Sequence, residues 1–164
     1  MKNFIKELIP YVIIIVVVVL IRMFIVTPVQ VDGNSMYPTL KDNEILLLKK
    51  YDQKYKRFDI VVLNYNNSKL IKRIIGLPGE HIEYKDNKLY VNGKYVKERF
   101  KRNTETSDFE IDKKIPKGYY FVMGDNRGNS LDSRDYRVGL VKKEDIVGVT
   151  IFRLYPFNKI GTIK

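Results

Sequence analysis

The chain consists of one long apolar run followed by many short ones. Residues 8–26 (LIPYVIIIVVVVLIRMFIV) contain a single charge, Arg22, and one proline, Pro10. As an α-helix this run would be about 28 Å long, close to the roughly 30 Å hydrocarbon core of a bilayer. Pro10 would fall in the first turn, where its missing N–H costs little, and Arg22 lies near the other end, where its side chain can reach the headgroups. The run therefore predicts a transmembrane helix.

Two other interpretations of this run fit less well. A cleaved signal peptide would need small residues at a cleavage site after the run, and residues 25–28 (IVTP) do not provide them. A buried strand seldom reaches such a length. Residues 1–7 carry two lysines against Glu7, and a short positive leader favours a cytoplasmic N-terminus. We expect residues 27–164 to form a domain on the extracytoplasmic face of the cell membrane.

Beyond residue 26 the pattern is that of β-structure. Short apolar or alternating runs are separated by turn residues such as Gly, Asn, Asp and Pro. The expected strands are 44–48, 59–63, 70–75, 81–84, 88–91, 94–96, 119–123 and 146–152. Asn92-Gly93 between two of them predicts a tight hairpin. Apart from a short helix or turn at 142–145, no helical periodicity follows, so the sequence predicts a mainly β domain with coiled antiparallel sheets or a barrel-like closure.

Residues 81–117 are expected to form a small inserted β subdomain. Its second half, residues 98–117, is highly charged and has almost no apolar pattern. We expect that half to be a protruding loop, and a flexible connection without a role is an equally good interpretation.

Composition excludes several classes of site. The 164 residues carry a formal net charge of +11, no cysteine and one histidine, His81, which excludes disulfides, thiolate metal sites and zinc sites with several histidines. The basic residues are scattered rather than gathered on one helix, so we expect anionic membrane headgroups rather than nucleic acid as their partner. No nucleotide-binding loop or metal-ligand spacing is present, and no cofactor or metal is expected.

A lysine interrupts an apolar strand at residues 70–75 (LIKRII). Alternation places Lys72 on the face of two aliphatic residues and Arg73 on the other, equally apolar face, so at least one cation is expected to be partly buried. The ordinary outcome is a lysine whose amine reaches solvent. The alternative is a lysine desolvated enough to lose its proton near neutral pH, which could then act as a general base toward a serine.

Two loops supply polar groups. In residues 33–40 (GNSMYPTL), Pro38 restrains its neighbour to an extended backbone, which would present the Ser35 hydroxyl on a stiff segment. Taken alone, this is also the pattern of an ordinary surface turn. In residues 124–134 (GDNRGNSLDSR), Asp132 and Arg134 can pair and Ser130 can orient a neighbouring group, although a plain salt-bridged loop has a similar composition.

Together, these stretches resemble the signature of the bacterial type I signal peptidases. Residues 33–40, 72–80 and 124–134 match the family's motifs in the family's order, behind an apolar N-terminal segment. Residues 59–63 and 155–161 are similar to further family motifs, and the resemblance covers nearly the whole chain apart from residues 81–117. Gly33, a single apolar segment and a compact domain are similar to Gram-positive members.

The resemblance implies a role for each matching residue. Ser35 would be the nucleophile, with its backbone N–H donating to the oxyanion, and Lys72 would be the general base. Ser130 would hydrogen-bond to the lysine and orient it. The remaining supporting residues would hold the active-site loop in place: Asp132, Arg134, Asp125 and Arg73.

The resemblance also implies how substrate would bind. The preprotein would lie as an added extended strand along a hydrophobic, membrane-facing edge, with small residues at the first and third positions before the cut. The candidates for lining those pockets are Val31, Met36, Leu40 and Ile71. Some members have a serine where this chain has Gly33, so the second oxyanion donor stays open between a backbone N–H and Asn34.

The function that the resemblance implies is removal of signal peptides from exported preproteins through an acyl-enzyme formed by a Ser-Lys dyad. One alternative is the same chemistry for a narrow client set, such as pilin or other surface-assembly precursors. Another is a membrane-anchored binding module without activity, for which paired Ser35 and Lys72 would be unnecessary. A Ser-His-Asp triad would have to use His81, which begins an expected surface hairpin.

Overall fold

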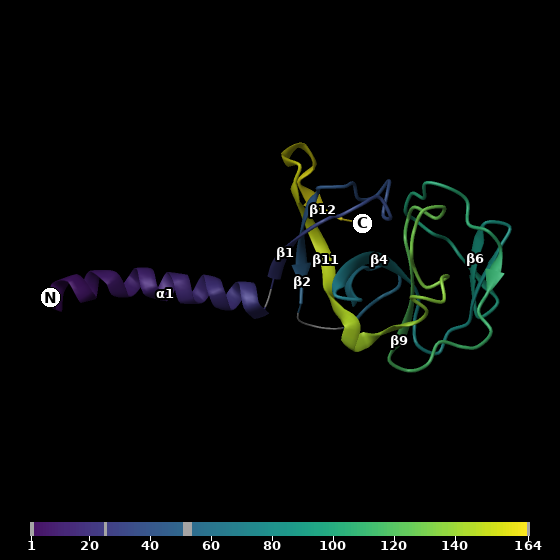
Figure 1. Cartoon of the computed structure of the whole chain (residues 1–164), viewed down its shortest axis with the longest axis horizontal. Coiled ribbons are helices and arrows are strands. Elements are labelled where there is room, and N and C mark those ends of the chain that lie inside the picture. Colours follow the sequence, from purple (N-terminus) through teal and green to yellow (C-terminus); the bar gives the residue numbers. More distant parts are fainter. Residues whose placement is uncertain (1, 25, 51–53, 164) are drawn as a thin grey trace.

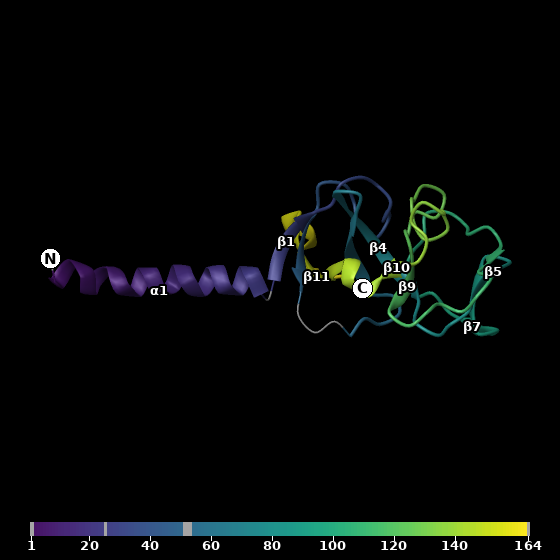
Figure 2. The same cartoon turned by 60° about the horizontal axis from the view of Figure 1, so that its bottom comes forward.

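The computed structural model describes residues 2–24, 26–50 and 54–163, with side chains of the N-terminal helix described for residues 7–19. Helix α1 (Lys2–Phe24) extends from one end of a β-domain in both ribbon views (Figure 1, Figure 2). It begins earlier than the expected 8–26 and ends earlier too, because Val26 already pairs with Lys49 as the first residue of a strand.

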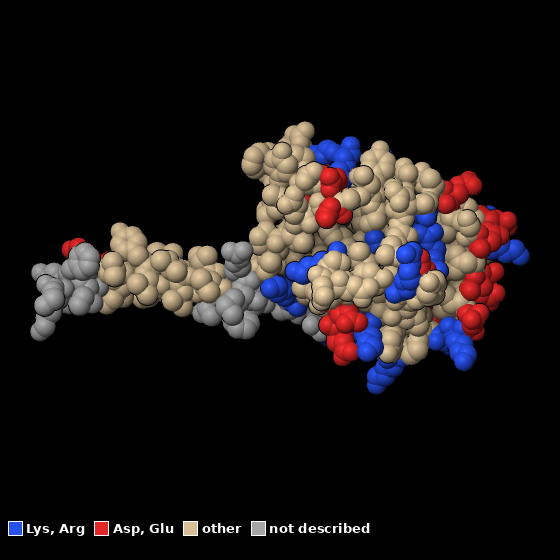
Figure 3. All heavy atoms as spheres, viewed as in Figure 1, with Lys and Arg blue, Asp and Glu red and all other residues tan. Residues whose placement is uncertain are grey.

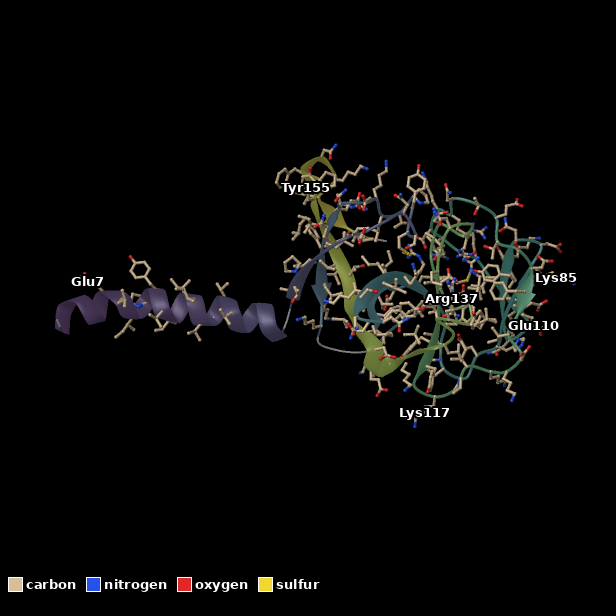
Figure 4. The ribbon with its side chains drawn as sticks, in the orientation of Figure 1. Glu7, Lys85, Glu110, Lys117, Arg137 and Tyr155 are labelled. Carbon is tan, nitrogen blue, oxygen red and sulfur yellow. The ribbon has the colours of Figure 1, made fainter. Side chains whose placement is uncertain are left out.

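The described part of α1 is apolar and exposed. Its large apolar side chains from Leu8 to Val19 are each about half exposed, and the space-filling view shows almost no charge along this stretch (Figure 3). Glu7 lies near its start (Figure 4). Among the described residues, no helix has both the length and the apolar character that crossing a membrane requires.

The larger sheet carries most of the domain. Its strands follow the order β1-β2-β11-β3-β4-β9-β10, with β12 paired to β11, and every pairing is antiparallel. The bounds are β1 (Val26–Gln30), β2 (Ile45–Lys49), β3 (Ile60–Tyr65), β4 (Ser68–Gly76), β9 (Tyr119–Met123), β10 (Val141–Lys142), β11 (Ile146–Tyr155) and β12 (Gly161–Thr162).

The expected barrel-like closure is wrong, because the two end strands β1 and β10 do not pair with each other in the described sheet. Alternation predicts which residues form strands but not which strands meet, and that is where the sequence-based expectation failed. The expected helix or turn at 142–145 is a single 3₁₀ turn, η1 (Lys143–Asp145), and a second one, η2 (Phe157–Lys159), follows β11.

A second sheet lies at the end of the molecule opposite α1. It has the order β7-β6-β5-β8 and consists of β5 (Ile82–Lys85), β6 (Lys88–Val91), β7 (Lys94–Val96) and β8 (Phe109–Glu110). Its outer edge bears Lys85 and Glu110 (Figure 4). The hairpin expected at Asn92-Gly93 is present, with positive φ at both residues.

Three apolar clusters hold these layers together. One cluster, with Val61, Ile74 and Val122 at its centre, packs within the larger sheet. The second joins the two sheets through Ile75, Ile82 and other residues. Segment 98–117 does not protrude, because Ile115 is buried in this second cluster and Glu98 and Thr106 are buried as well. Because Glu98 and Thr106 are polar, their burial leaves no apolar pattern in the sequence.

Candidate active site

The Ser35 hydroxyl and the Lys72 amine meet between two segments of the larger sheet. Lys72 Nζ donates a hydrogen bond to Ser35 Oγ over 2.7 Å. Ser35 lies in the turn that links β1 to β2, and two backbone bonds shape that turn, Tyr37 N–H to the Asn34 carbonyl and Leu40 N–H to the Met36 carbonyl. The turn is anchored by the buried side chains of Met36 and Leu40. The geometry is that of a nucleophile beside a base.

Lys72 is almost completely removed from solvent. Its relative exposure is 2% on strand β4. Burial disfavours the charged amine and, against the opposing attraction of Asp132, lowers the pKa of Lys72 from 10.5 to about 8; Arg134 lowers it further and Asp125 raises it. At pH 8 about half of the molecules therefore carry a neutral amine that can accept a proton.

The adjacent Arg73 makes a buried pair with Asp125. Two parallel bonds of 2.8 and 2.7 Å join the guanidinium to the carboxylate, and both side chains are buried. Arg73 also donates to the Phe58 carbonyl, and the Thr39 hydroxyl donates to Asp125. Since Thr39 belongs to the serine turn and Arg73 to the lysine strand, this pair ties the two segments to each other.

Residues 124–134 form a closed hydrogen-bonded loop beside the serine turn. Asp132 accepts two bonds from the Arg134 guanidinium, each 2.8 Å long, and one of 2.9 Å from the Gly124 N–H. Although burial alone would raise it, this environment, Arg134 above all, holds the pKa of Asp132 below its ordinary value. Asp132 is therefore a charged group at neutral pH, and it is one of the charges that act on Lys72.

Ser130 does not make the expected hydrogen bond to Lys72. Its hydroxyl is buried and has no hydrogen-bond partner within normal geometry among the described residues, and it adds to the polar surroundings of Asp132. The hydroxyl packs against Gly124, where a Cβ atom would lie 2.2 Å from Ser130 Oγ and 2.4 Å from the Ser35 carbonyl oxygen. Only glycine lets these two loops approach so closely.

The residues expected to line the substrate pockets lie in one cluster. Val31, Met36 and Leu40 are buried with Leu46 and Ile60, and Ile71 packs against them while remaining partly exposed. The structure thus brings all four candidates together beneath the serine turn. The first three form its floor, and Ile71 offers apolar surface to a ligand.

The backbone donors of the turn differ in availability. Gly33 has a φ of 83°, and its N–H donates to Asp42 Oδ1 over 2.8 Å, so that N–H is already used. The Ser35 N–H has no hydrogen-bond partner in the described part of the chain. It is therefore free to bind a developing oxyanion.

His81 lies away from this arrangement. Its Nε2 contacts the Ile111 carbonyl oxygen over 2.7 Å at the edge of the second sheet, whereas the Ser35 hydroxyl contacts Lys72. The Ser-His-Asp hypothesis therefore fails.

Sequence reasoning missed two residues that support the site. Asn126 donates its backbone N–H to the Ser35 carbonyl and its side-chain amide to the Asn34 carbonyl, each over 3.0 Å. Arg127 is buried and pairs with Glu98 over 2.5 Å. Both belong to the stretch 124–134 that the sequence singles out, but their partners lie far away along the chain.

Comparisons with known proteins identify the family of this chain. The family described as "Signal peptidase, peptidase S26" matches residues 2–155. Signal peptidase I T of Bacillus subtilis (strain 168) is 45% identical, with 93% of this chain and 86% of the relative covered. Signal peptidase I S of the same strain is 46% identical over 91% of this chain and 88% of its own length.

A solved structure is similar as well. The crystal structure of a signal peptidase I from Enterococcus faecalis V583 is 38% identical, with a TM-score of 0.52, and the match covers 58% of this chain and 96% of that one. Since the family match spans nearly the whole chain and includes the turn of Ser35 and the strand of Lys72, this chain belongs to the signal peptidase I family of S26 peptidases.

Proposed function

We propose that this chain is a membrane-anchored serine endopeptidase that removes N-terminal signal peptides from exported preproteins, with Ser35 as nucleophile and Lys72 as general base. The observation that carries the proposal is the 2.7 Å hydrogen bond between these two side chains, made by a lysine that is 2% exposed. A buried lysine with a pKa of about 8 can be neutral at the pH of the cell surface.

The reaction begins with proton transfer within the dyad. Neutral Lys72 takes the proton of Ser35 Oγ as that oxygen bonds to the scissile carbonyl carbon, and the free Ser35 N–H donates to the resulting oxyanion. Collapse breaks the C–N bond, and the lysine returns its proton to the leaving amine. Lys72 then takes a proton from water, whose oxygen attacks the acyl carbon. When the bond from that carbon to Ser35 Oγ breaks, Lys72 returns the proton to Ser35 Oγ, and the carboxylic acid product leaves.

Ser130 is proposed to act once acylation has begun. During that step Ser35 Oγ becomes bonded to carbon and is lost as an acceptor of the lysine proton. The Ser130 hydroxyl is buried and unsatisfied among the described residues, so it can accept a hydrogen bond from the Lys72 ammonium. Asp132, which Arg134 holds in place by two hydrogen bonds, stabilises that ammonium from the same loop.

Substrate is proposed to bind as an extended strand next to the serine turn. The apolar cluster of Val31, Met36 and Leu40 forms the floor there, and Ile71 contributes partly exposed surface. Shallow apolar surface of this kind accepts small side chains at the first and third positions before the cut and rejects charged ones. The relatives are named as signal peptidases, which agrees with a preprotein substrate.

We propose that α1 belongs to a single membrane anchor formed by residues 8–26. The sequence supports this with 19 residues that carry one charge, and the described apolar side chains from Leu8 to Val19 are exposed, as lipid-facing side chains would be. The positive leader 1–7 supports a cytoplasmic N-terminus, which leaves the β-domain on the outer face.

Cleavage of a precursor tests this function. The full chain in nonionic detergent is incubated with a precursor that bears a small-x-small cleavage site, and the N-terminus of the product is sequenced. We expect cleavage after that site, and loss of at least a thousandfold in rate in Ser35→Ala and in Lys72→Ala. Ser107→Ala and Lys85→Ala, both at exposed positions, serve as matched controls.

Normal activity in either Ser35→Ala or Lys72→Ala would refute the proposed dyad. Failure of the folded wild-type chain to cleave any precursor in a broad survey would favour a binding role, whereas cleavage of only a few surface-assembly precursors would favour a narrow client set.

A further inference from the structure

Segment 98–106 reaches from the second sheet back to the loop that supports Ser35. Glu98, Asn103 and Thr106 of this segment make hydrogen bonds or ion pairs with residues 125–127, although the second sheet lies at the far end of the molecule from α1 (Figure 1). We propose that this segment is a positioning element for the catalytic serine, with Asn103 orienting Asn126 and Glu98 fixing Arg127. The inference rests on the proposed function and adds residues outside the dyad to it.

Asn103 forms a relay to the serine turn. Its backbone N–H donates to the Asp125 carbonyl over 3.2 Å, and its side-chain Nδ2 donates to Asn126 Oδ1 over the same distance. Asn126 Nδ2 then donates to the Asn34 carbonyl, and Asn126 N–H donates to the Ser35 carbonyl. The carbonyls on both sides of the Ser35 N–H are therefore held by one residue, which Asn103 supports.

The Asn103 contact helps to fix which way the Asn126 amide points. An amide side chain has an acceptor on one side and a donor on the other, and its two orientations differ little in shape. Because Asn126 Oδ1 accepts from Asn103, its NH₂ group faces the Asn34 carbonyl. Without Asn103 only the Asn34 carbonyl favours this orientation, so the Asn126 amide is held less firmly and its hydrogen bond to the turn that presents Ser35 is weakened.

Glu98 anchors the same loop by charge. Its carboxylate pairs with Arg127 over 2.5 Å, and Arg127 also donates to the hydroxyls of Thr106 and Tyr84. All of these partners come from residues 84–106, the second sheet and its following segment. A buried guanidinium needs such partners, since leaving it unpaired is strongly unfavourable.

Arg127 connects segment 98–106 to the loop 124–134. Its Nε donates to the Gly124 carbonyl over 3.1 Å, and its own carbonyl accepts a bond of 2.8 Å from Arg134. Gly124 is the residue against which both Ser130 and the Ser35 carbonyl pack. Segment 98–106 is thereby connected to the serine turn at two independent points, through Asn126 and through Arg127.

A positioning role should change turnover more than binding, because the pocket residues lie elsewhere. The test compares the full-length wild type in nonionic detergent with Asn103→Ala, using a precursor with an alanine-x-alanine site. We expect kcat to fall about threefold to tenfold, as for loss of one positioning hydrogen bond, while KM changes less than twofold. Asn103 is exposed, so the thermal midpoint should stay within 2 °C of wild type, on the order expected for a surface change.

A double-mutant cycle separates this role from a general structural effect. In the Asn126→Ala background, adding Asn103→Ala should reduce kcat no further, because the relay is already broken. Glu98→Gln should also lower kcat. Glu105→Gln should not, because Glu105 is exposed on the same segment and makes no hydrogen bond or ion pair with the described residues. If Glu98→Gln fails to fold, the double-mutant cycle of Asn103 and Asn126 still tests the positioning role.

The results that would refute the positioning role differ from the result that would refute the proposed function. An active wild type whose kcat is unchanged by Asn103→Ala would refute the positioning role alone. Additive losses in the double variant, or a rise in KM with unchanged kcat, would refute it as well. A wild type that cleaves no precursor would refute the proposed function before this inference is reached.

Discussion

Replacing the buried Lys72, the proposed general base, with a nearly isosteric apolar side chain should inactivate the enzyme and yet stabilise its fold. Lys72 is 2% exposed, and its pKa in the folded chain is about 8 against an ordinary value of 10.5. In Lys72→Met the apolar part of the side chain remains, but no charge has to be buried.

The size of the effect follows from the pKa difference. The fall of the Lys72 pKa from 10.5 to about 8 is equivalent to roughly 3 kcal/mol of stability that the charged lysine removes at pH values below 8. Between pH 8 and 10.5 the unfolded chain still binds the proton while the folded chain has released it, so wild-type stability rises with pH. At pH 10 the remaining penalty is about 1 kcal/mol.

The assay is urea unfolding of both proteins in the same nonionic detergent at pH 6 and pH 10. We expect the advantage of Lys72→Met over wild type to shrink by roughly 2–3 kcal/mol between these two values. Groups other than Lys72 titrate in both proteins and cancel in the comparison. The lost hydrogen bond to Ser35 changes the difference at both pH values and does not affect its pH dependence.

A difference between the two proteins that does not depend on pH would refute the reasoning. It would mean that the amine of Lys72 has an ordinary pKa in the folded chain, and that a neutral lysine is not available for catalysis near neutral pH.

Two further predictions concern activity. The acid limb of kcat/KM should have its midpoint near pH 8, with activity rising as Lys72 loses its proton, and a midpoint near 6.5, typical of histidine, would contradict the assignment. Gly124→Ala should lower kcat at least about tenfold, because its Cβ would collide with Ser130 Oγ and the Ser35 carbonyl; Gly128→Ala, whose Cβ would lie 3.2 Å from a rotatable threonine hydroxyl, is the matched control, and equal activities would refute the packing argument.

The strands were largely predictable from the sequence because each one alternates or is uniformly apolar. The expected runs at 88–91, 94–96 and 119–123 coincide with β6, β7 and β9. Strand β1 was missed because its sequence, VTPVQ, contains a proline and neither alternates cleanly nor is uniformly apolar, and its first residue belongs to the apolar N-terminal run. The open edges of the larger sheet were missed because pairing between distant strands leaves no local pattern.

The candidate site, too, was only partly predictable from the sequence. Ser35 and Lys72 could be singled out because each interrupts its surroundings, one as a hydroxyl in a stiff turn and the other as a cation in an apolar strand. Glu98 and Asn103 could not, since a charged, polar segment without periodicity looks like an exposed loop. Only the fold shows that Glu98 meets a buried arginine there.

Strand β11 lies between β2 and β3, although it is formed by residues 146–155 near the end of the sequence. The turn that carries Ser35 joins β1 to β2, and Lys72 lies on β4 beside β3, so the two residues of the proposed dyad belong to segments that β11 joins. Until β11 has been synthesised, the pair β1–β2 and the pair β3–β4 have no strand between them in the larger sheet. We therefore expect the proposed dyad to form only when nearly the whole sequence is present, so that a chain truncated before β11 lacks activity.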